Sequence, residues 1–208
     1  MKIKLMISLA LVTLMWSCAT TMSSTWKKGD YEGRQFSKIL VVVEASTKQG
    51  RVNSENTIVD RLQKEGINAT NSLGVFPLNE NVQSLSPEEI ESRILEGDYD
   101  GVLVSSLVDA NSRQVREGGG VYSEPVYYRY GRRVRMGYVH VQEPEYYRQQ
   151  TTYVLETQLY DTKDAASKES VVWSGQSEET DPSSVESAVK AYSKKLVNTL
   201  ISSGVIKN

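Results

Sequence analysis

The sequence predicts an α/β (α+β) domain with a mixed sheet of about five strands, three helices and a Tyr/Arg-rich hairpin or loop insertion. An unbroken branched aliphatic run at 39–43 is typical of a strand covered on both faces. The run Ser86-Pro87-Glu88-Glu89 has the composition of a helix start, with a capping hydroxyl, a proline in the first turn and a reciprocal glutamate. The expected order is strand, helix, strand, helix, strand, insertion, strand, strand, helix, which favours parallel crossovers early and an antiparallel pair late.

A first helix should follow the strand at 39–43, because Asn53 or Ser54 can cap it and Gly66 suits a left-handed stop. Its inner stripe is expected to carry Ile58, Val59 and Leu62. The remaining elements expected in this half are a short strand around 68–73, a helix from Ser86 to Gly97 and a third buried strand at 101–108.

The second half should contain two antiparallel strands and a long helix. Apolar and polar residues alternate at 153–159, and a second strand is expected at 171–178. The dipeptide at 181–182 can open the helix and Gly204 can close it, after which residues 205–206 can fold back onto the core. The apolar residues at helical spacing are Val185, Ala188, Val189, Tyr192, Leu196, Val197, Leu200 and Ile201.

The first eighteen residues have the pattern of a bacterial export signal that ends in the only cysteine of the chain. Lys2 and Lys4 precede an apolar run at 5–15, which is short for a bilayer span. Cys18 follows just after the expected cut site. This pattern resembles the lipobox of bacterial lipoproteins, although Met15 stands where that motif usually carries leucine. An ordinary signal peptide with an incidental cysteine, or an uncleaved membrane helix, would give a similar pattern.

The resemblance implies that Cys18 is joined to diacylglycerol and becomes the acylated first residue of the mature chain. A lone cysteine in an exported protein would otherwise be an unpaired thiol in an oxidising compartment. Each buried methylene contributes about 0.8 kcal/mol, so two or three acyl chains would hold the protein on the membrane. Ala19 follows the cysteine where aspartate would favour the inner membrane, so the outer membrane is the expected location.

The mature chain is expected to be one domain behind a short tether. Residues 1–17 are the signal peptide, 18–35 form a lipid-anchored tether, and 36–208 form a single α/β domain with an insertion at 110–150. Trp26 of the tether could lie at the membrane interface, but packing on the edge of its own domain is the more ordinary role for such a residue.

Composition argues against several classes of function. Without the signal, the chain has 22 basic and 26 acidic residues, which gives no support to nucleic-acid binding. The single histidine, His140, and the absence of a cysteine beyond Cys18 leave a zinc or iron-sulfur site almost without ligands. The glycines at 118–120 lack the strand-to-helix setting of a phosphate loop. The sequence therefore predicts no metal, no cofactor and no nucleic-acid partner.

Four stretches mark the fold: Lys38-Ile39-Leu40-Val41-Val42-Val43, Asp100-Gly101-Val102-Leu103-Val104, Leu159-Tyr160-Asp161 and Val172-Trp173-Ser174-Gly175. Together they resemble a group of small bacterial cell-envelope lipoproteins of unknown function, whose order nearly the whole mature chain follows. More distantly, the arrangement is similar to the α/β domains of curli-secretion lipoproteins and to the amino-terminal domain of the Tol-system periplasmic protein. These stretches carry no catalytic residues, so the resemblance implies an envelope location and leaves the biochemical role open.

Three pairs of carboxylates are candidates for acid-base chemistry, whereas His140, between two valines, is expected on a strand face and not as a base. A general acid needs burial to raise its pKa, whereas these pairs lie in polar runs, so we expect solvated turns or strand faces. The sequence therefore favours a non-catalytic binding or assembly module, with a cell-envelope hydrolase that uses paired carboxylates as the alternative. Two facing carboxylates in a deep cleft would favour the hydrolase. The pairs are Asp98 with Asp100, Glu143 with Glu145, and Glu178 with Glu179.

Residues 113–148 differ in composition from the rest of the chain. They hold seven of the eleven arginines, no lysine and four acidic residues, so their net charge is about +3, whereas the rest of the mature chain is about −7. Tyrosine and arginine are enriched at interfaces, because a rigid ring and a planar donor fork bind at low entropic cost. We therefore expect a binding surface for an acidic protein or an anionic envelope glycan; the alternative is a two-stranded extension or mobile loop whose tyrosines pack on one another. The residues assigned to this surface are Arg129, Tyr130, Arg132, Arg133, Arg135, Tyr138, Tyr146, Tyr147, Tyr127 and Tyr128.

Overall fold

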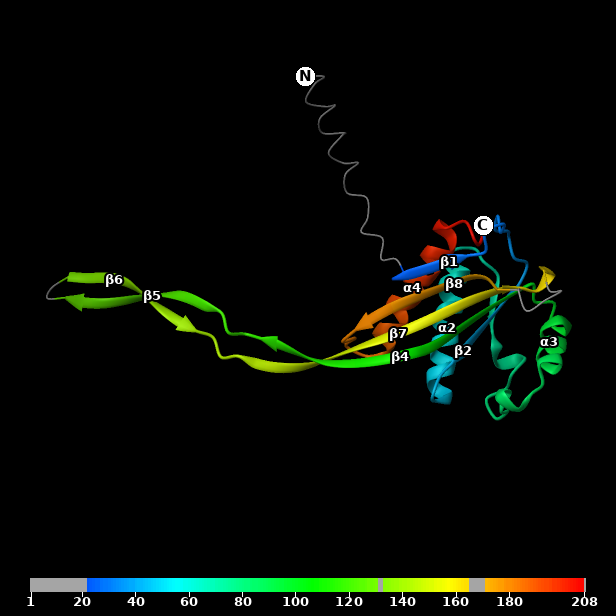
Figure 1. Ribbon diagram of the computed structural model, residues 1–208, viewed down its shortest axis with the longest axis horizontal. Helices are drawn as coiled ribbons and strands as arrows, with labels where there is room; N and C mark the ends of the chain where they lie inside the picture. Colours follow the sequence, from blue (N-terminus) through cyan, green and yellow to red (C-terminus); the bar gives the residue numbers. More distant parts are fainter. Residues whose placement is uncertain (1–21, 131–132, 165–170, 208) are drawn as a thin grey trace, which may run out of the picture.

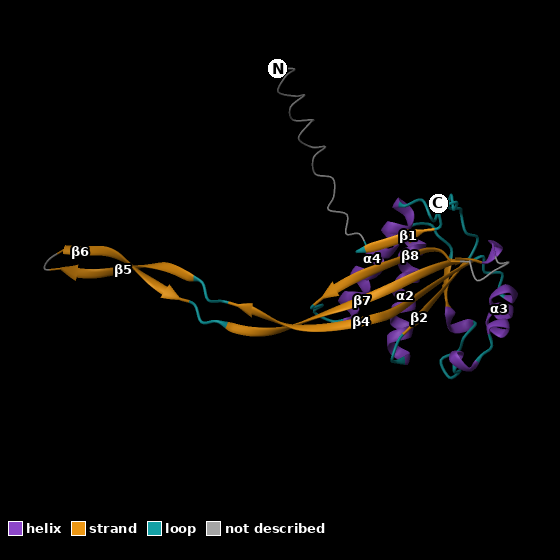
Figure 2. Ribbon diagram, in the orientation of Figure 1, coloured by secondary structure: helices purple, strands orange, loops and turns teal. Residues whose placement is uncertain are grey.

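The computed structural model describes residues 22–130, 133–164 and 171–207. Over these residues the chain forms a six-stranded mixed sheet, a separate two-stranded sheet and three α-helices (Figure 2), which confirms the predicted α/β (α+β) class. The elements are β1 (Ser24–Lys27), β2 (Ile39–Glu44), α2 (Lys48–Lys64), β3 (Ala69–Asn71), α3 (Pro87–Glu96), β4 (Gly101–Glu117), β5 (Val121–Tyr130), β6 (Arg133–Gln142), β7 (Tyr146–Asp161), β8 (Val171–Thr180) and α4 (Val185–Ser202), with short 3-10 turns at Ser72–Gly74, Val82–Ser84 and Thr162–Asp164.

The strand order of the large sheet is β1-β8-β7-β4-β2-β3. β2 lies parallel to both β3 and β4, so the helical connections α2 and α3 are the crossovers that parallel pairing requires. β7 pairs antiparallel with β4 and β8, and β1 pairs antiparallel with β8. The early parallel and late antiparallel pairing predicted from the element order is therefore confirmed.

The larger core lies between the sheet and helices α2 and α4. Ile39 and Val41 of β2 point to this face, because alternate residues of a strand share a face, and both are fully buried. Trp173 of β8 is the largest fully buried side chain of this core. Burial of each large apolar side chain contributes about 1.5–3 kcal/mol, so this layer dominates the stability of the body. Other fully or almost fully buried members are Ile58, Leu62, Leu103, Leu159, Tyr192, Leu196, Leu200, Val205 and Ile206.

The opposite face of the sheet carries a smaller core. Leu40 and Val102 point to this side and are covered by Phe76 and Tyr99. Helix α3 packs here through partly buried side chains and has no buried residue of its own. The predicted capping box is confirmed, since the Glu89 amide donates to the Ser86 hydroxyl at 3.2 Å while the Ser86 amide donates to the Glu89 carboxylate at 2.9 Å.

The helix stops were predicted better than the helix starts. Gly66 and Gly204 have φ values of +80° and +65°, as left-handed stops require. Helix α2 begins at Lys48 rather than after Asn53 or Ser54, because the Thr47 hydroxyl accepts a hydrogen bond from the Gly50 amide at 3.0 Å and so caps the helix earlier.

The expected start of the last helix at 181–182 was, by contrast, too early. Ser184 caps α4 through a reciprocal pair with Ser187, while Asp181 lies in a left-handed turn with φ +45°. Beyond the helix, Val205 and Ile206 are buried, so the predicted return of the chain onto the core is confirmed.

The domain begins earlier than the expected boundary at residue 36. Within the segment assigned to the tether, 18–35, β1 pairs with β8 from Ser24 opposite Gln176 to Lys27 opposite Trp173. Trp26 lies on this edge strand and is half exposed. The boundary was misplaced because the strand has little apolar area of its own and is held by backbone pairing to its neighbour.

β4 and β7 run on beyond the rest of the sheet (Figure 1). From the pair Ser112–Thr151 outward, β4 and β7 pair only with each other. β5 and β6 then continue as a separate hairpin. We call residues 112–151 the arm. The predicted insertion at 110–150 is therefore a long hairpin that grows out of two central strands of the body.

We predict that Leu196→Asp unfolds the body, because Leu196 is fully buried between α4 and the sheet and a carboxylate there would have no partner. The cost should be about 3 kcal/mol or more, a large share of ordinary domain stability. Thermal melting measures it, with Lys194→Asp on the exposed side of the same helix as the control. An unchanged melting temperature for Leu196→Asp would show that this face is not core.

Candidate functional site

A glycine joint separates the base of the arm from its tip. The base ends at the pair Glu117–Tyr146, and the tip hairpin starts at Val121. Gly118 and Gly119 have φ values of +79° and +78°, and a Cβ on Gly118 would lie 2.2 Å from the carbonyl oxygen of Pro144. Only glycine fits such a left-handed close approach, so Gly118 and Gly119 have a structural role in the arm.

Ion pairs fix the base of the arm to the body. Arg148 donates to the carboxylates of Glu117, at 2.8 Å, and of Asp181, which lies just after β8. The Thr151 amide donates to the other oxygen of Asp181 at 2.7 Å. Arg116 pairs with Glu145 across the joint. The hydrogen bonds that Arg148 donates to Asp181 and Glu117 raise the pKa of its guanidinium, so it stays charged at any ordinary pH.

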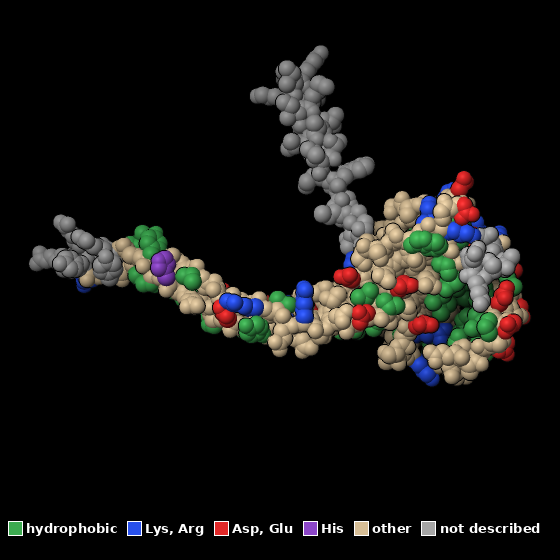
Figure 3. All heavy atoms as spheres, in the orientation of Figure 1, with side chains coloured by type: hydrophobic (Ala, Val, Ile, Leu, Met, Phe, Trp, Pro, Cys, Tyr) green, Lys and Arg blue, Asp and Glu red, His purple; other side chains and the backbone are tan. Residues whose placement is uncertain are grey.

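The tip hairpin, 121–142, is covered by no third strand, and none of its residues with described burial is buried. Tyr127 lies opposite Met136, and Pro125 lies opposite Tyr138; the side chains of Tyr127 and Tyr138 are 71% and 63% exposed. Figure 3 shows hydrophobic side chains along this part of the arm. An isolated two-stranded hairpin is only marginally stable in water, and exposed apolar area of this kind marks interaction sites.

The structure places the described members of the candidate surface on the outside of the arm. Tyr127, Arg129 and Tyr138 are exposed on the tip, and Tyr146 and Tyr147 are exposed on the base. Tyr128, Tyr130, Arg133 and Arg135 lie on β5 and β6, where only the backbone is described, while Arg132 and Cys18 lie outside the described residues.

His140 lies on a strand face, as the sequence analysis expected. Its Nδ1 is 3.0 Å from the hydroxyl of Ser123 on the facing strand, and both residues are exposed. Its neighbours on the same face include Pro125 on the facing strand and Tyr138 on its own strand, neither of which can orient an imidazole as a carboxylate does. This pair is a cross-strand hydrogen bond open to water, where a nucleophile would gain little activation.

The paired carboxylates do not face one another. Asp98 is exposed, whereas Asp100 is almost fully buried, so the expectation that both lie in a solvated turn was wrong for Asp100. The same correction applies to Glu179, which is buried and lies 2.6 Å from Lys195, while its neighbour Glu178 is exposed. Adjacent strand residues point to opposite faces, which separates that pair.

The pair Glu143 and Glu145 is exposed beside the glycine joint, as expected. The Glu145 carboxylate is held by Arg116, and Glu143 donates its backbone amide to the Gly120 carbonyl at 2.8 Å. Both residues therefore serve the geometry of the arm.

Asp100 instead shares an arginine with Asp161, a residue the sequence analysis did not select. Arg34 donates to Asp100 Oδ2 at 2.8 Å and to both oxygens of Asp161 at 2.7 Å. The backbone amides of Ser37 and Lys38 each donate to Asp100 at 2.9 Å. This Arg34 cluster joins the segment before β2 to the start of β4 and the end of β7.

The electrostatics of the Arg34 cluster do not suit a general acid. Burial alone would raise the pKa of Asp100, but the hydrogen bonds from Arg34, Lys38 and Ser37 outweigh it and lower that pKa to about 2. In Asp161, burial is likewise outweighed by the hydrogen bond from Arg34, so its pKa is also lowered. Both groups stay ionised at neutral pH, whereas a general acid must hold its proton there.

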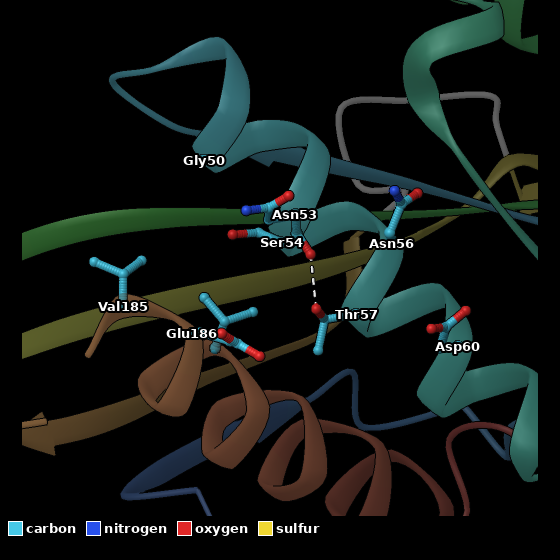
Figure 4. Close-up of a pocket in the computed structure, with 9 residues that line it drawn as sticks. Gly50, Asn53, Ser54, Asn56, Thr57, Asp60, Val185 and Glu186 are labelled. Atoms are coloured by element: carbon cyan, nitrogen blue, oxygen red, sulfur yellow. Dashed lines mark hydrogen bonds between the residues drawn. The ribbon is translucent and has the colours of Figure 1, made fainter. Parts of the chain in front are cut away.

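A hollow of about 450 Å³ lies between the first turns of α2 and α4 (Figure 4). Its ionisable groups are Asp60 and Glu186, and the Thr57 hydroxyl donates to the Asn53 carbonyl at 2.7 Å within α2. Four further lining residues carry amide or hydroxyl side chains on the turns of α2. The complete lining is Gly50, Asn53, Ser54, Asn56, Thr57, Asp60, Val185, Glu186 and Val189.

The described residues are 22–130, 133–164 and 171–207. They contain no group of three or more His, Cys, Asp or Glu side chains that could hold a metal ion. Nor does any helix in this part of the chain reach the length and apolarity that a membrane span needs.

No protein-family model matches the chain, and no curated protein matches it in sequence. Among solved structures it is similar to a PelC dodecamer from Paraburkholderia phytofirmans, with a TM-score of 0.43 and 14% identity over 89% of this chain and 97% of that one. It is also similar to lipoprotein GNA1162 from Neisseria meningitidis, with a TM-score of 0.39 and 14% identity over 78% and 99% of the two chains. A PDZ domain protein from Parabacteroides distasonis gives a TM-score of 0.37 and 12% identity over 96% of this chain and 40% of that one. Scores and identities this low establish no shared function.

We predict that Arg34→Ala lowers the free energy of unfolding by about 3 kcal/mol, because it leaves the buried Asp161 without its cation and Asp100 with only the exposed Lys163, 3.6 Å away. Denaturant unfolding measures the change, and Arg93→Ala, which breaks the more exposed pair with Glu80, should cost much less. Equal losses for the two variants would contradict a central role for Arg34.

Acid should weaken the same cluster. The folded pKa of Asp100 lies below the ordinary value of about 3.9, so its stabilising contribution is complete above that value and is lost as pH falls through the folded pKa of about 2. Asp100→Asn should therefore be less stable than wild type at neutral pH but lose less stability between about pH 5 and about pH 2. Parallel acid profiles of the two proteins would contradict this assignment.

Proposed function

We propose that the protein is a lipid-anchored, non-catalytic binding module of the bacterial cell envelope, and that its arm holds a partner with an anionic surface. The observation that carries the proposal is the tip hairpin itself: a two-stranded sheet that projects from the body, with exposed tyrosines on a net positive segment. A folded body with a bare, aromatic, basic arm suits binding in trans, because nothing in its own described body covers the arm.

The charge of the arm is concentrated at its tip. At the base, 112–120 and 143–151, three arginines meet three glutamates, and the described arginines are used in contacts within the molecule. The tip, 121–142, has four arginines and one glutamate, for a net charge of +3. Arginine forks bind carboxylates and phosphates with paired hydrogen bonds, so the tip suits an anionic partner.

Acylated Cys18 would keep this module at a membrane, and we place it at the outer membrane. Only six peptide links separate Cys18 from Ser24, the first residue of β1, so the body would lie within roughly 20 Å of the lipid surface. The partner is an acidic protein surface in this proposal, with an anionic envelope glycan as the other outcome of its test. The hydrolase alternative gains no support from the described carboxylates, because the buried ones, such as Asp100, have lowered pKa values or a cationic partner.

To test the arm, we would replace residues 118–145 by Asn-Gly. This tight turn would connect Glu117 to Tyr146, which form the last cross-strand pair at the base of the arm. The shortened protein should keep the melting temperature of wild type, because the deleted residues do not pack on the body. It should lose the partners captured by crosslinking in intact cells. Capture of the same partners by the shortened protein would place the binding surface on the body, and sensitivity of capture to glycan-degrading enzymes would identify a glycan.

To test the anchor, we would label growing cells with a clickable palmitate analogue and compare wild type with Cys18→Ser. Wild type should carry the label and fractionate with outer membranes, whereas the variant should carry none and leave the membrane fraction. An unlabelled wild type would end the lipid-anchor proposal without affecting the one for the arm.

A further inference from the structure

We propose that the partner of the arm is a second copy of this chain, and that the arm tip of one copy binds the acidic surface around α3 of the next. This inference rests on the proposed function and names its partner. It predicts head-to-tail association through two different surfaces, in place of a symmetric dimer.

The acceptor surface is the segment 80–98, which includes α3. It contains six acidic residues and one arginine, for a net charge of −5. No residue of α3 is buried, and Glu88, Glu89, Glu91 and Glu96 are all exposed. Leu95 is 52% exposed among them, so an apolar contact lies within the acidic surface.

Some of these carboxylates are already used within the molecule, and others are available. Glu80 forms an ion pair with Arg93 at 2.6 Å, and Glu89 belongs to the capping box. Within the described part of the chain, Glu88 and Glu91 form no ion pair. A partner that brings arginine could therefore bind these two without breaking α3.

The two surfaces cannot meet within one molecule. The acidic segment leads directly into the start of β4, whereas the arm is the other end of the same strand (Figure 1). β4 has 17 residues, so it holds the two surfaces roughly 55 Å apart before the tip adds its own length. Acidic side chains are visible at the α3 end of the body in Figure 3. Opposite charges fixed at opposite ends favour association between molecules.

The tip and the acidic surface also carry complementary types of side chain. The tip sequence contains four arginines, and its exposed side chains include tyrosine and methionine, while the acceptor carries exposed carboxylates and an exposed leucine. Charge pairs of this type give orientation and specificity, while aromatic and aliphatic contact supplies binding energy. Covering both exposed apolar sets would also stabilise the tip hairpin, which is marginal alone.

The test uses the full chain in intact cells, where Cys18 is the only natural cysteine. A chain that carries both Leu95→Cys and Tyr127→Cys should give a ladder of dimers and larger species with a short bismaleimide crosslinker. Replacing Leu95→Cys by Asp60→Cys, at an exposed position of α2, should abolish the ladder. No ladder from the Leu95–Tyr127 combination would overturn the inference.

Charge reversal tests the same contact by a second route. Glu88→Lys with Glu91→Lys, or Arg129→Glu with Arg135→Glu, should each lower the crosslinking yield by roughly tenfold or more. Coexpressing the two reversed chains should restore crosslinked dimers, because the unaltered tip of one chain then meets the unaltered α3 surface of the other. Glu44→Lys with Asp60→Lys is the control at exposed sites and should leave the yield unchanged.

The outcomes separate the two proposals. If reversal of α3 leaves the ladder intact, or coexpression fails to restore crosslinked dimers, the head-to-tail contact is wrong. In that case, arm-dependent capture of another protein would leave the proposed function standing. Melting temperatures equal to wild type establish that the reversed chains are folded.

Discussion

The arrangement of the body depends on Arg34, which binds the carboxylates of both Asp100 and Asp161. The Arg34 side chain binds Asp100, the residue before β4, and Asp161, the last residue of β7, and its backbone forms a bridge to Ile206 near the carboxyl end. Its guanidinium also lies 4.1 Å above the ring of Phe36. One residue therefore joins the segment before β2, the two central strands and the segment after α4, and its guanidinium supplies the buried Asp161 with its cation.

This constraint explains why the arm projects from one end only. β4 and β7 are fixed at the Arg34 cluster, so their extra length extends in the opposite direction, beyond the ends of β2 and β8. The body has two apolar layers, whereas the tip has none. Stability and binding are thus divided between the two ends of the same strands, and a change in the tip need not disturb the core.

Local signals allowed much of the body to be predicted from the sequence. The aliphatic run of β2, the capping box at Ser86 and the glycine stops at Gly66 and Gly204 act within a few residues, so their consequences can be derived from neighbours. The cap at Thr47 was missed because several residues that can cap a helix lie in a row there. Contacts between distant residues were beyond such reasoning: Arg34 and Asp161 are 127 positions apart, and β1 is held by pairing with β8. For the candidate site, composition identified the segment, but the division into a neutral base and a basic tip needed the strand register.

Amide hydrogen exchange of the protein, diluted until it sediments as a monomer, tests the central claim most directly: that the body folds by itself and the arm tip depends on a partner. The account predicts strong protection in β2 and in the body part of β4, with nearly free exchange in β5 and β6 that slows when the arm is bound. Protection of β5 and β6 in the monomer equal to that of β2 would contradict it, because the tip would then be a stable element with no need of a partner.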